Sequence, residues 1–284
     1  MAAHPNHITK QNLGNDAWGN PIALYRFKAP QPVTAQSTRM PKVFLTTGVH
    51  GMEHVAVLTA YLMFEQMMNN WQSSKLLEVL RNNLEFLIIP VCNPSGYNKY
   101  TRKNDNGVDI NRNFPDGFGW QSTDPSSPYY GGAAPLDQLE SQYIVRVFDE
   151  NPDLDVMYDF HNFNGTSAEL HPHLIWIAGY IGGQYVEHMT QSVVRKLTNH
   201  WRDKFTWIPQ SETWFAGYSD ATEGAMIKDY AVHSRGIPFT ATFEVGGKWW
   251  IDPAGVPYDL NHKQSCLEAL VNFILINLNE LKRI

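Results

Sequence analysis

The sequence predicts an α/β fold: a single domain with a mixed, mostly parallel sheet and helices on both faces. Short apolar runs rich in β-branched residues alternate with helical patterns along the whole chain, which is the order of a parallel sheet joined by crossover helices. The strand runs are apolar at nearly every position, as expected when both faces of a sheet are buried. No repeat or linker divides the chain, so we expect one domain over residues 1–284.

The first half of the chain contains two predicted strands and two predicted helices. Residues 43–49 and 84–91 form the buried strands, and a glycine-containing turn follows each of them. Apolar residues three and four apart predict a helix from about 54 to 71. Ser73 and Ser74 are suitable caps for a second helix through Leu80. Residues 97–134 are rich in Asn, Asp, Gly and aromatic residues, and a loop of that length usually has a function.

The second half continues the alternation. The predicted helices cover residues 136–148, 184–205, 224–233 and 260–281, and the predicted strands cover residues 154–160, 173–178 and 239–245.

Composition excludes several functional classes. Hydrophobic residues make up 43% of the chain, which is far too many for a disordered protein. The formal charge of −6, from 22 basic and 28 acidic residues, argues against a nucleic-acid partner. No signal-peptide pattern and no apolar run of membrane-spanning length occurs, so we expect a cytoplasmic protein without a membrane partner.

A possible metal site lies at the end of the first predicted strand. His50 and Glu53 are three residues apart where the next helix begins, and ligands bind at this edge of open α/β sheets. A neutral imidazole and a carboxylate can hold zinc together with a third protein ligand. The same stretch also fits the inverted zincin pattern, with His50 and His54 as ligands. That pattern needs both histidines in one helix, whereas His50 ends a strand, so we regard His54 as a bystander.

Four motifs in order along the chain resemble the M14 metallocarboxypeptidase family of the carboxypeptidase A type. They are His50-Gly-Met-Glu53, the segment from Asn93-Pro-Ser-Gly through Arg102 to Asp109-Ile-Asn-Arg-Asn-Phe114, Tyr158-Asp-Phe-His161-Asn, and Thr242-Phe-Glu244. Each motif alone is weak, but the ordered combination from about residue 43 to 244 is specific.

The resemblance implies a role for each matching residue. His50, Glu53 and His161 would hold one Zn²⁺ per chain, and Asp109 would orient the His50 ring. Glu244 would be the general base. The remaining matches are Arg102, which would stabilise the oxyanion, and Asn111 and Arg112, which would bind the terminal carboxylate of the substrate.

The expected substrate is a peptide with a free C-terminal carboxylate, including short cell-wall peptides. The family has a mobile tyrosine in its substrate site, for which Tyr218 is the candidate and Tyr230 the competitor. The residue at the floor of the side-chain pocket depends on how the family pattern is aligned with residues 224–231. One register places Asp229 at its floor and selects basic side chains, whereas the register that we favour places Lys228 there and selects acidic ones.

Two other functions remain possible from the sequence. An N-acyl amino-acid deacylase of the aspartoacylase kind shares the zinc layout, although the segment 101–114 and the strand ending at Glu244 favour a peptidase. A non-catalytic peptide-binding module would need a broken catalytic set, whereas Arg102 and Glu244 are both present. The sequence does not predict the oligomeric state.

Overall fold

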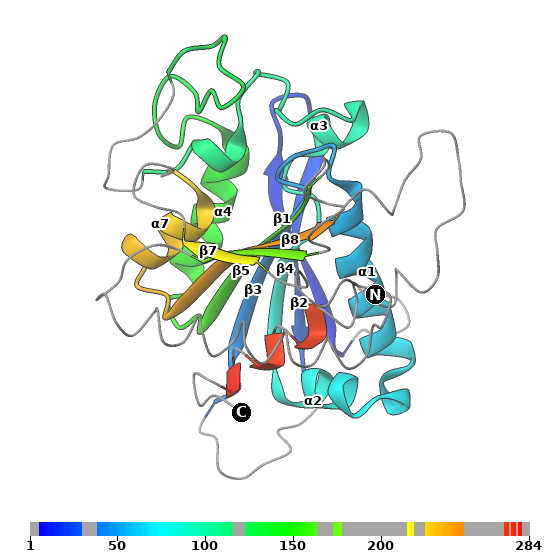
Figure 1. The fold of residues 1–284 in the computed structure, drawn as a ribbon. Coiled ribbons are helices and arrows are strands. Elements are labelled where there is room, and N and C mark those ends of the chain that lie inside the picture. Colours follow the sequence, from blue (N-terminus) through cyan, green and yellow to red (C-terminus); the bar gives the residue numbers. More distant parts are fainter. Residues whose placement is uncertain are drawn as a thin grey trace.

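The computed structural model describes residues 6–29, 39–115, 123–163, 173–177, 215–218, 225–246 and 270–279, except 273 and 277 in the last range. These residues form one sheet, drawn in Figure 1. Its strands are β1 (Ile8–Asn15), β2 (Pro21–Lys28), β3 (Lys42–Thr47), β4 (Glu85–Ile89), β5 (Val156–Phe163), β6 (His173–Ile177), β7 (Phe215–Tyr218) and β8 (Phe239–Gly246).

The sheet is mixed and mostly parallel, as predicted. The spatial order of its strands is β1-β2-β4-β3-β5-β8-β6-β7. Four neighbouring pairs are parallel, namely β4–β3, β3–β5, β5–β8 and β6–β7, and the other three are antiparallel. Because β3, β5 and β8 are parallel neighbours, their carboxyl ends meet at one edge of the sheet.

Helices cover both faces of the sheet (Figure 1). They are α1 (His54–Asn69), α2 (Lys75–Asn83), α3 (Pro94–Lys99), α4 (Leu139–Glu150) and α7 (Ile227–His233), with 3₁₀ turns η1 (Trp71–Ser73) and η2 (Ile110–Arg112). Alternate residues of β3 face opposite sides: Val43 and Leu45 pack with α1, α2 and helical residues in 270–279, whereas Phe44 packs with α4 and α7. None of the helices in the described ranges is long and apolar enough to cross a bilayer.

Left-handed backbone accounts for three of the differences between predicted and observed boundaries. Gly48 has φ 61° and ends β3 before Val49. Leu136 has φ 59°, so α4 begins at Leu139 instead of residue 136. Ala225 has φ 70°, so α7 begins at Ile227 instead of residue 224. The hairpin β1–β2 was not predicted, and the predicted helix at residues 184–205 lies outside the described residues.

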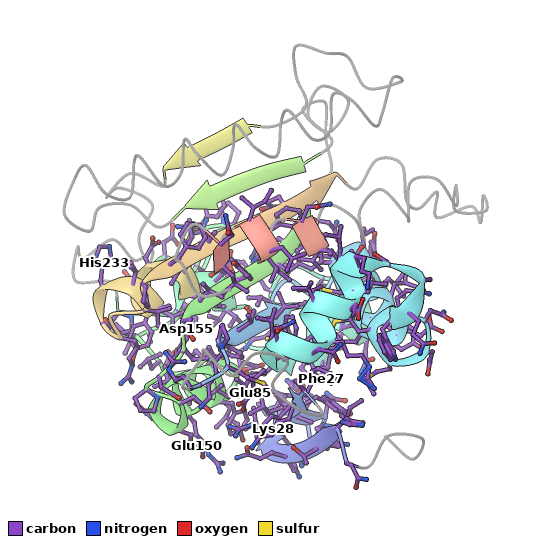
Figure 2. The ribbon with its side chains drawn as sticks, turned by 90° about the horizontal axis from the view of Figure 1, so that it is seen from below. Phe27, Lys28, Glu85, Glu150, Asp155 and His233 are labelled. Atoms are coloured by element: carbon purple, nitrogen blue, oxygen red, sulfur yellow. The ribbon has the colours of Figure 1, made fainter. Side chains whose placement is uncertain are left out.

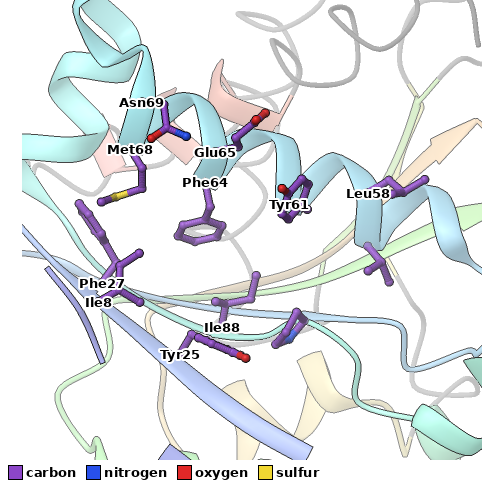
Figure 3. Close-up of a pocket in the computed structure, with 12 residues that line it drawn as sticks. Ile8, Tyr25, Phe27, Leu58, Tyr61, Phe64, Glu65, Met68, Asn69 and Ile88 are labelled. Carbon is purple, nitrogen blue, oxygen red and sulfur yellow. The ribbon is translucent and has the colours of Figure 1, made fainter. Parts of the chain in front are cut away.

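An apolar cavity of about 720 Å³ lies between α1 and strands β1, β2 and β4. Figure 3 shows Tyr25 and Ile88 on the sheet side and Phe64 and Met68 on the helix side. None of the predicted site residues lines this cavity.

Candidate metal centre

Three predicted zinc ligands meet at the carboxyl edge of β3 and β5. His50 and Glu53 follow β3, and His161 lies near the end of β5. The Nδ1 atom of His50 is 2.7 Å from Glu53 Oε1, and the Nδ1 atom of His161 is 2.7 Å from Glu53 Oε2. The two Nδ1 atoms are 3.1 Å apart. All three side chains are buried, and their ligand atoms lie within 4.8 Å of one another.

Two glycines shape the loop that carries His50. Gly48 adopts the left-handed conformation with φ 61°, which turns the chain away from β3 at low steric cost. Gly51 packs directly against the backbone of α3, because a Cβ atom there would lie 2.0 Å from the carbonyl carbon of Gly96. His50 is therefore held between the end of β3 and the segment that begins at Asn93.

Glu53 is the N-cap residue of α1, but its side chain does not cap the helix. Its carboxylate is turned towards the two histidines. Asn162 of β5 takes over the capping role, since its Oδ1 accepts hydrogen bonds from Val55 N at 3.1 Å and Ala56 N at 3.3 Å. Asn162 N also donates to Glu53 Oε2 at 3.2 Å. Because Asn162 caps the helix, the Glu53 carboxylate is free to act as a metal ligand.

Each histidine has a carboxylate behind it. His50 Nε2 lies 3.1 Å from Asp109 Oδ1, and His161 Nε2 lies 2.6 Å from Asp159 Oδ2. A carboxylate at Nε2 favours the tautomer with the proton on that nitrogen, which leaves the lone pair of Nδ1 facing the centre. Asp109 contacts His50 Nε2, the ring that the family resemblance implies it would orient, whereas the hydrogen bond of Asp159 to His161 was not predicted.

The donor set fits a divalent cation. Two imidazole lone pairs and two carboxylate oxygens converge on one point, and without a cation or an extra proton between them they would repel one another. Burial opposes protonation of His161, but the charges of Asp159 and Glu53 raise its pKa well above the ordinary value. Burial likewise opposes ionisation of Glu53, yet the two histidines lower its pKa. Both shifts show that the centre attracts positive charge. A cation can supply that charge in place of a proton, and two neutral histidines with one carboxylate form a set that binds zinc.

Glu244 lies beside the ligands because β8 pairs with β5 in register. His161 and Glu244 are directly opposite residues of these two parallel strands. The Oε2 atom of Glu244 is buried and has no hydrogen-bond partner within the described ranges. Burial and then the charge of Glu53 raise the pKa of Glu244 to about 7. An orphaned carboxyl oxygen at this position is suited to a bound water or substrate group.

Two arginines lie on the loop side of the centre. Arg102 donates from Nε to Asp109 Oδ2 at 2.9 Å, and its Nη1 is 3.4 Å from His50 Nδ1. Arg112 donates to the carbonyl of Asn111 at 2.8 Å. Between them lies Tyr129, which is 46% exposed. The guanidinium carbons of Arg102 and Arg112 are 5.8 and 5.3 Å from its ring centroid, a contact that the sequence did not predict.

Asn111 faces inwards and is only 3% exposed. Its Nδ2 donates to Asp159 Oδ2 at 2.8 Å and lies 3.2 Å from His161 Nε2, and its Oδ1 accepts from Ile227 N at 3.0 Å. Asn111 thus connects the metal centre to the first residue of α7.

Lys228 and Asp229 are both buried at the start of α7. Lys228 Nζ donates to Asp229 Oδ1 at 2.9 Å and to Oδ2 at 3.0 Å. Burial lowers the pKa of Lys228, Asp229 opposes this shift, and the charge of Arg112 adds to it.

Two tyrosines and one histidine remain to be placed. Tyr230 packs in the core against Phe114 and Phe148, which favours Tyr218 as the tyrosine of the substrate site. Tyr218 ends β7, and its side chain lies outside the described residues. His54 stacks on Tyr97 with ring centroids 3.9 Å apart and takes no part in the ligand group. The inverted zincin reading is therefore not supported.

Comparison with known proteins agrees with this geometry. A family model described as zinc carboxypeptidase matches residues 1–255. Carboxypeptidase A1 of Rattus norvegicus is 24% identical over 262 residues, which is 86% of this chain and 59% of that protein. An inactive metallocarboxypeptidase of Saccharomyces cerevisiae is 26% identical over 182 residues, 58% of this chain and 41% of that protein. The matched region thus covers 59% of the first of these relatives and 41% of the second, less than two thirds of either.

Solved structures show the same fold. The crystal structure of carboxypeptidase A from Helicoverpa armigera superposes with a TM-score of 0.71 at 21% identity, covering 98% of this chain and 69% of that one. A metallo-carboxypeptidase from Pseudomonas aeruginosa superposes with a TM-score of 0.65 at 15% identity, covering 99% of this chain and 67% of that one.

Proposed function

The chain belongs to the zinc carboxypeptidase family, and we therefore propose that it hydrolyses the peptide bond next to a free C-terminal carboxylate. The observation that carries the proposal is the pairing of the ligand group with a base. His50, Glu53 and His161 form the zinc-ligand group typical of the family, and the unpartnered oxygen of Glu244 lies on the strand position opposite His161.

His50, Glu53 and His161 would hold one zinc ion per chain. Bound zinc supplies a Lewis acid that lowers the pKa of water towards ~7 and polarises the scissile carbonyl. Glu244 takes the proton of the attacking water and passes it to the leaving amine, a role for which its buried oxygen is available because it has no hydrogen-bond partner within the described residues. Arg102 donates hydrogen bonds to the oxyanion that forms on the carbonyl carbon. The ion pair with Asp109, at 2.8 Å, fixes the Arg102 guanidinium in place.

The substrate carboxylate would bind Arg112, because a guanidinium offers two parallel donors to a carboxylate. Tyr218 remains in the predicted substrate-binding set. Asn111 was also predicted there, but its side chain is buried and its amide is hydrogen-bonded to Asp159 and to Ile227 N, so it supports the centre from inside the protein. Lys228 is paired with Asp229 in the structure, so it would bind a substrate carboxylate only on leaving that ion pair. On the alignment that we favour, Lys228 lies at the floor of the side-chain pocket, where it would favour a C-terminal acidic residue, including the extra carboxylate of a cell-wall diamino acid.

Turnover of blocked dipeptides by zinc-loaded protein tests the function. Substrates ending in Glu, Lys and Phe should be cleaved with Glu preferred, and the C-terminally amidated forms should be poor substrates. Removal of zinc with a chelator should abolish activity, and added zinc should restore it. Glu244→Gln should retain the metal and lose at least ~10²-fold in rate.

Each contrary outcome points to a particular error. Equal turnover of free and amidated substrates would show that the protein is not a carboxypeptidase. Faster turnover of N-acetyl amino acids than of dipeptides would instead identify the deacylase. A preference for Lys would place Asp229 in the pocket, and a preference for Phe would show that neither charge reaches the substrate.

A further inference from the structure

We propose that Asp159 is a positioning residue that fixes His161 as a metal ligand and sets the zinc affinity of the centre. The proposal rests on zinc binding by the ligand group and is independent of which substrate the protein cleaves. The family resemblance implies that Asp109 orients the His50 ring, but it assigns no such hydrogen-bond partner to His161.

The strand itself places Asp159 and His161 together. Residues two apart on a strand point to the same face, so Asp159 and His161 of β5 both project to one side of the sheet. The resulting distance between Asp159 Oδ2 and His161 Nε2 is 2.6 Å. The sequence signal for this contact is therefore an aspartate two residues before the histidine on a single strand.

Three hydrogen bonds hold the Asp159 carboxylate in a site where it has no exposed surface. Oδ1 accepts from Thr46 Oγ1 at 2.7 Å, and Oδ2 accepts from Asn111 Nδ2 at 2.8 Å as well as from His161. Thr46 and Asp159 are opposite residues of the parallel pair β3–β5. A buried carboxylate is costly unless it is paired and hydrogen-bonded, and here each of its partners restricts its orientation.

The hydrogen bond to Asp159 fixes the orientation of the His161 ring. The carboxylate holds the proton on Nε2, directs the Nδ1 lone pair at Glu53 and His50, and increases the basicity of the ligand. Changing such a partner typically weakens metal affinity by about 10–100-fold. Because Asn111 also accepts from Ile227 N at 3.0 Å, Asp159 further stabilises the contact between the centre and α7.

Zinc affinity, measured by competition with a chromogenic chelator, tests the proposal separately from turnover. Asp159→Asn preserves the shape of the side chain and removes its charge. We expect its zinc dissociation constant to rise about 10–100-fold. Thr46→Val removes one hydrogen bond to the carboxylate and should give a smaller loss in the same direction, so it provides a second test if Asp159→Asn folds poorly.

Asp155→Asn is the matched control. Asp155 is also buried, immediately precedes β5, and pairs with Arg39 at 2.7 Å. It lies at the opposite end of the strand from His161, roughly 20 Å away for six residues of extended chain; Figure 2 labels it at the end of the sheet seen from below. Its replacement should lower the melting temperature and leave zinc affinity unchanged.

Two results would overturn the proposal: an unchanged zinc dissociation constant in both Asp159→Asn and Thr46→Val, or an equal loss of affinity in Asp155→Asn. Failure of the parent protein to bind zinc would contradict the proposed function itself. A parent that binds zinc but cleaves no peptide would contradict the proposed function and leave this inference standing.

Discussion

Glu244→Gln should stabilise the metal-free protein at alkaline pH. In the folded chain, burial and then the charge of Glu53 raise the pKa of Glu244 from 4.5 to about 7. At ~1.36 kcal/mol per pH unit, this difference corresponds to about 3 kcal/mol. For a chain of this size the melting temperature should change by roughly 5–10 °C.

The sign follows from which state binds the proton more tightly. Below pH 4.5 both the folded and the unfolded states carry a protonated Glu244, and its burial costs no charge desolvation. As the pH rises through about 7, the folded state must bury a carboxylate, so the stability that the neutral form contributed is lost. Glutamine is neutral throughout. The advantage of Glu244→Gln should therefore be small at pH 4 and large at pH 8.

Thermal melts of both proteins after metal removal, at several pH values, measure this difference. Glu78→Gln on the surface of α2 serves as a control and should change stability by less than about 0.5 kcal/mol at either pH. Rebinding zinc should reduce the advantage of Glu244→Gln, since a nearby dication stabilises the carboxylate. A difference in melting temperature that does not depend on pH would refute the reasoning.

Four further outcomes are expected. His161→Ala should lose zinc and activity, whereas His54→Ala should keep both, as measured by metal content and turnover. Arg112→Ala should lower kcat/KM for dipeptides by about 10–100-fold, because it removes a hydrogen-bonded charge partner; an unchanged KM would contradict its role as carboxylate anchor. Lys228→Met should abolish the preference for C-terminal Glu, and a retained preference would remove Lys228 from the pocket. Gly51→Ala cannot fit against the Gly96 backbone, where its Cβ would lie 2.0 Å from a carbonyl carbon, so zinc retention and melting temperature should both fall; overpacking costs about 1–3 kcal/mol.

The sequence predicted the buried parts of the fold best. Strands such as β3 and β4 contribute apolar residues to both faces of the sheet, so short apolar runs reveal them directly. Strand β1 is an edge strand with mostly polar residues, which gives no such signal, and the hairpin that it forms with β2 was not predicted. Two helices were predicted to start too early, where Leu136 and Ala225 adopt left-handed conformations. A positive φ at a residue other than glycine cannot be inferred from the identity of that residue.

The same contrast applies to the metal centre. The spacing of His50 and Glu53 suggested two ligands, and resemblance to a known family supplied His161 and Asp109. Asp159 and Asn162 flank His161 on β5, where they look like isolated polar residues within an apolar strand. The contact between Asp159 and His161 follows from their spacing on one strand, but the bond from Thr46 to Asp159 depends on the pairing of β5 with β3, and the bonds from α1 to Asn162 depend on the position of that helix.

The in-register pairing of β5 with β8 also determines which genetic changes the centre can tolerate. A substitution in either strand leaves His161 opposite Glu244, because backbone hydrogen bonds set the alignment. Deleting one residue of β8 before Glu244 would move every following side chain to the other face. The carboxylate would then enter the apolar core that holds Phe243. Length variation among homologous chains should therefore concentrate in the loops, and a single-codon deletion in β8 should be more damaging than most substitutions there.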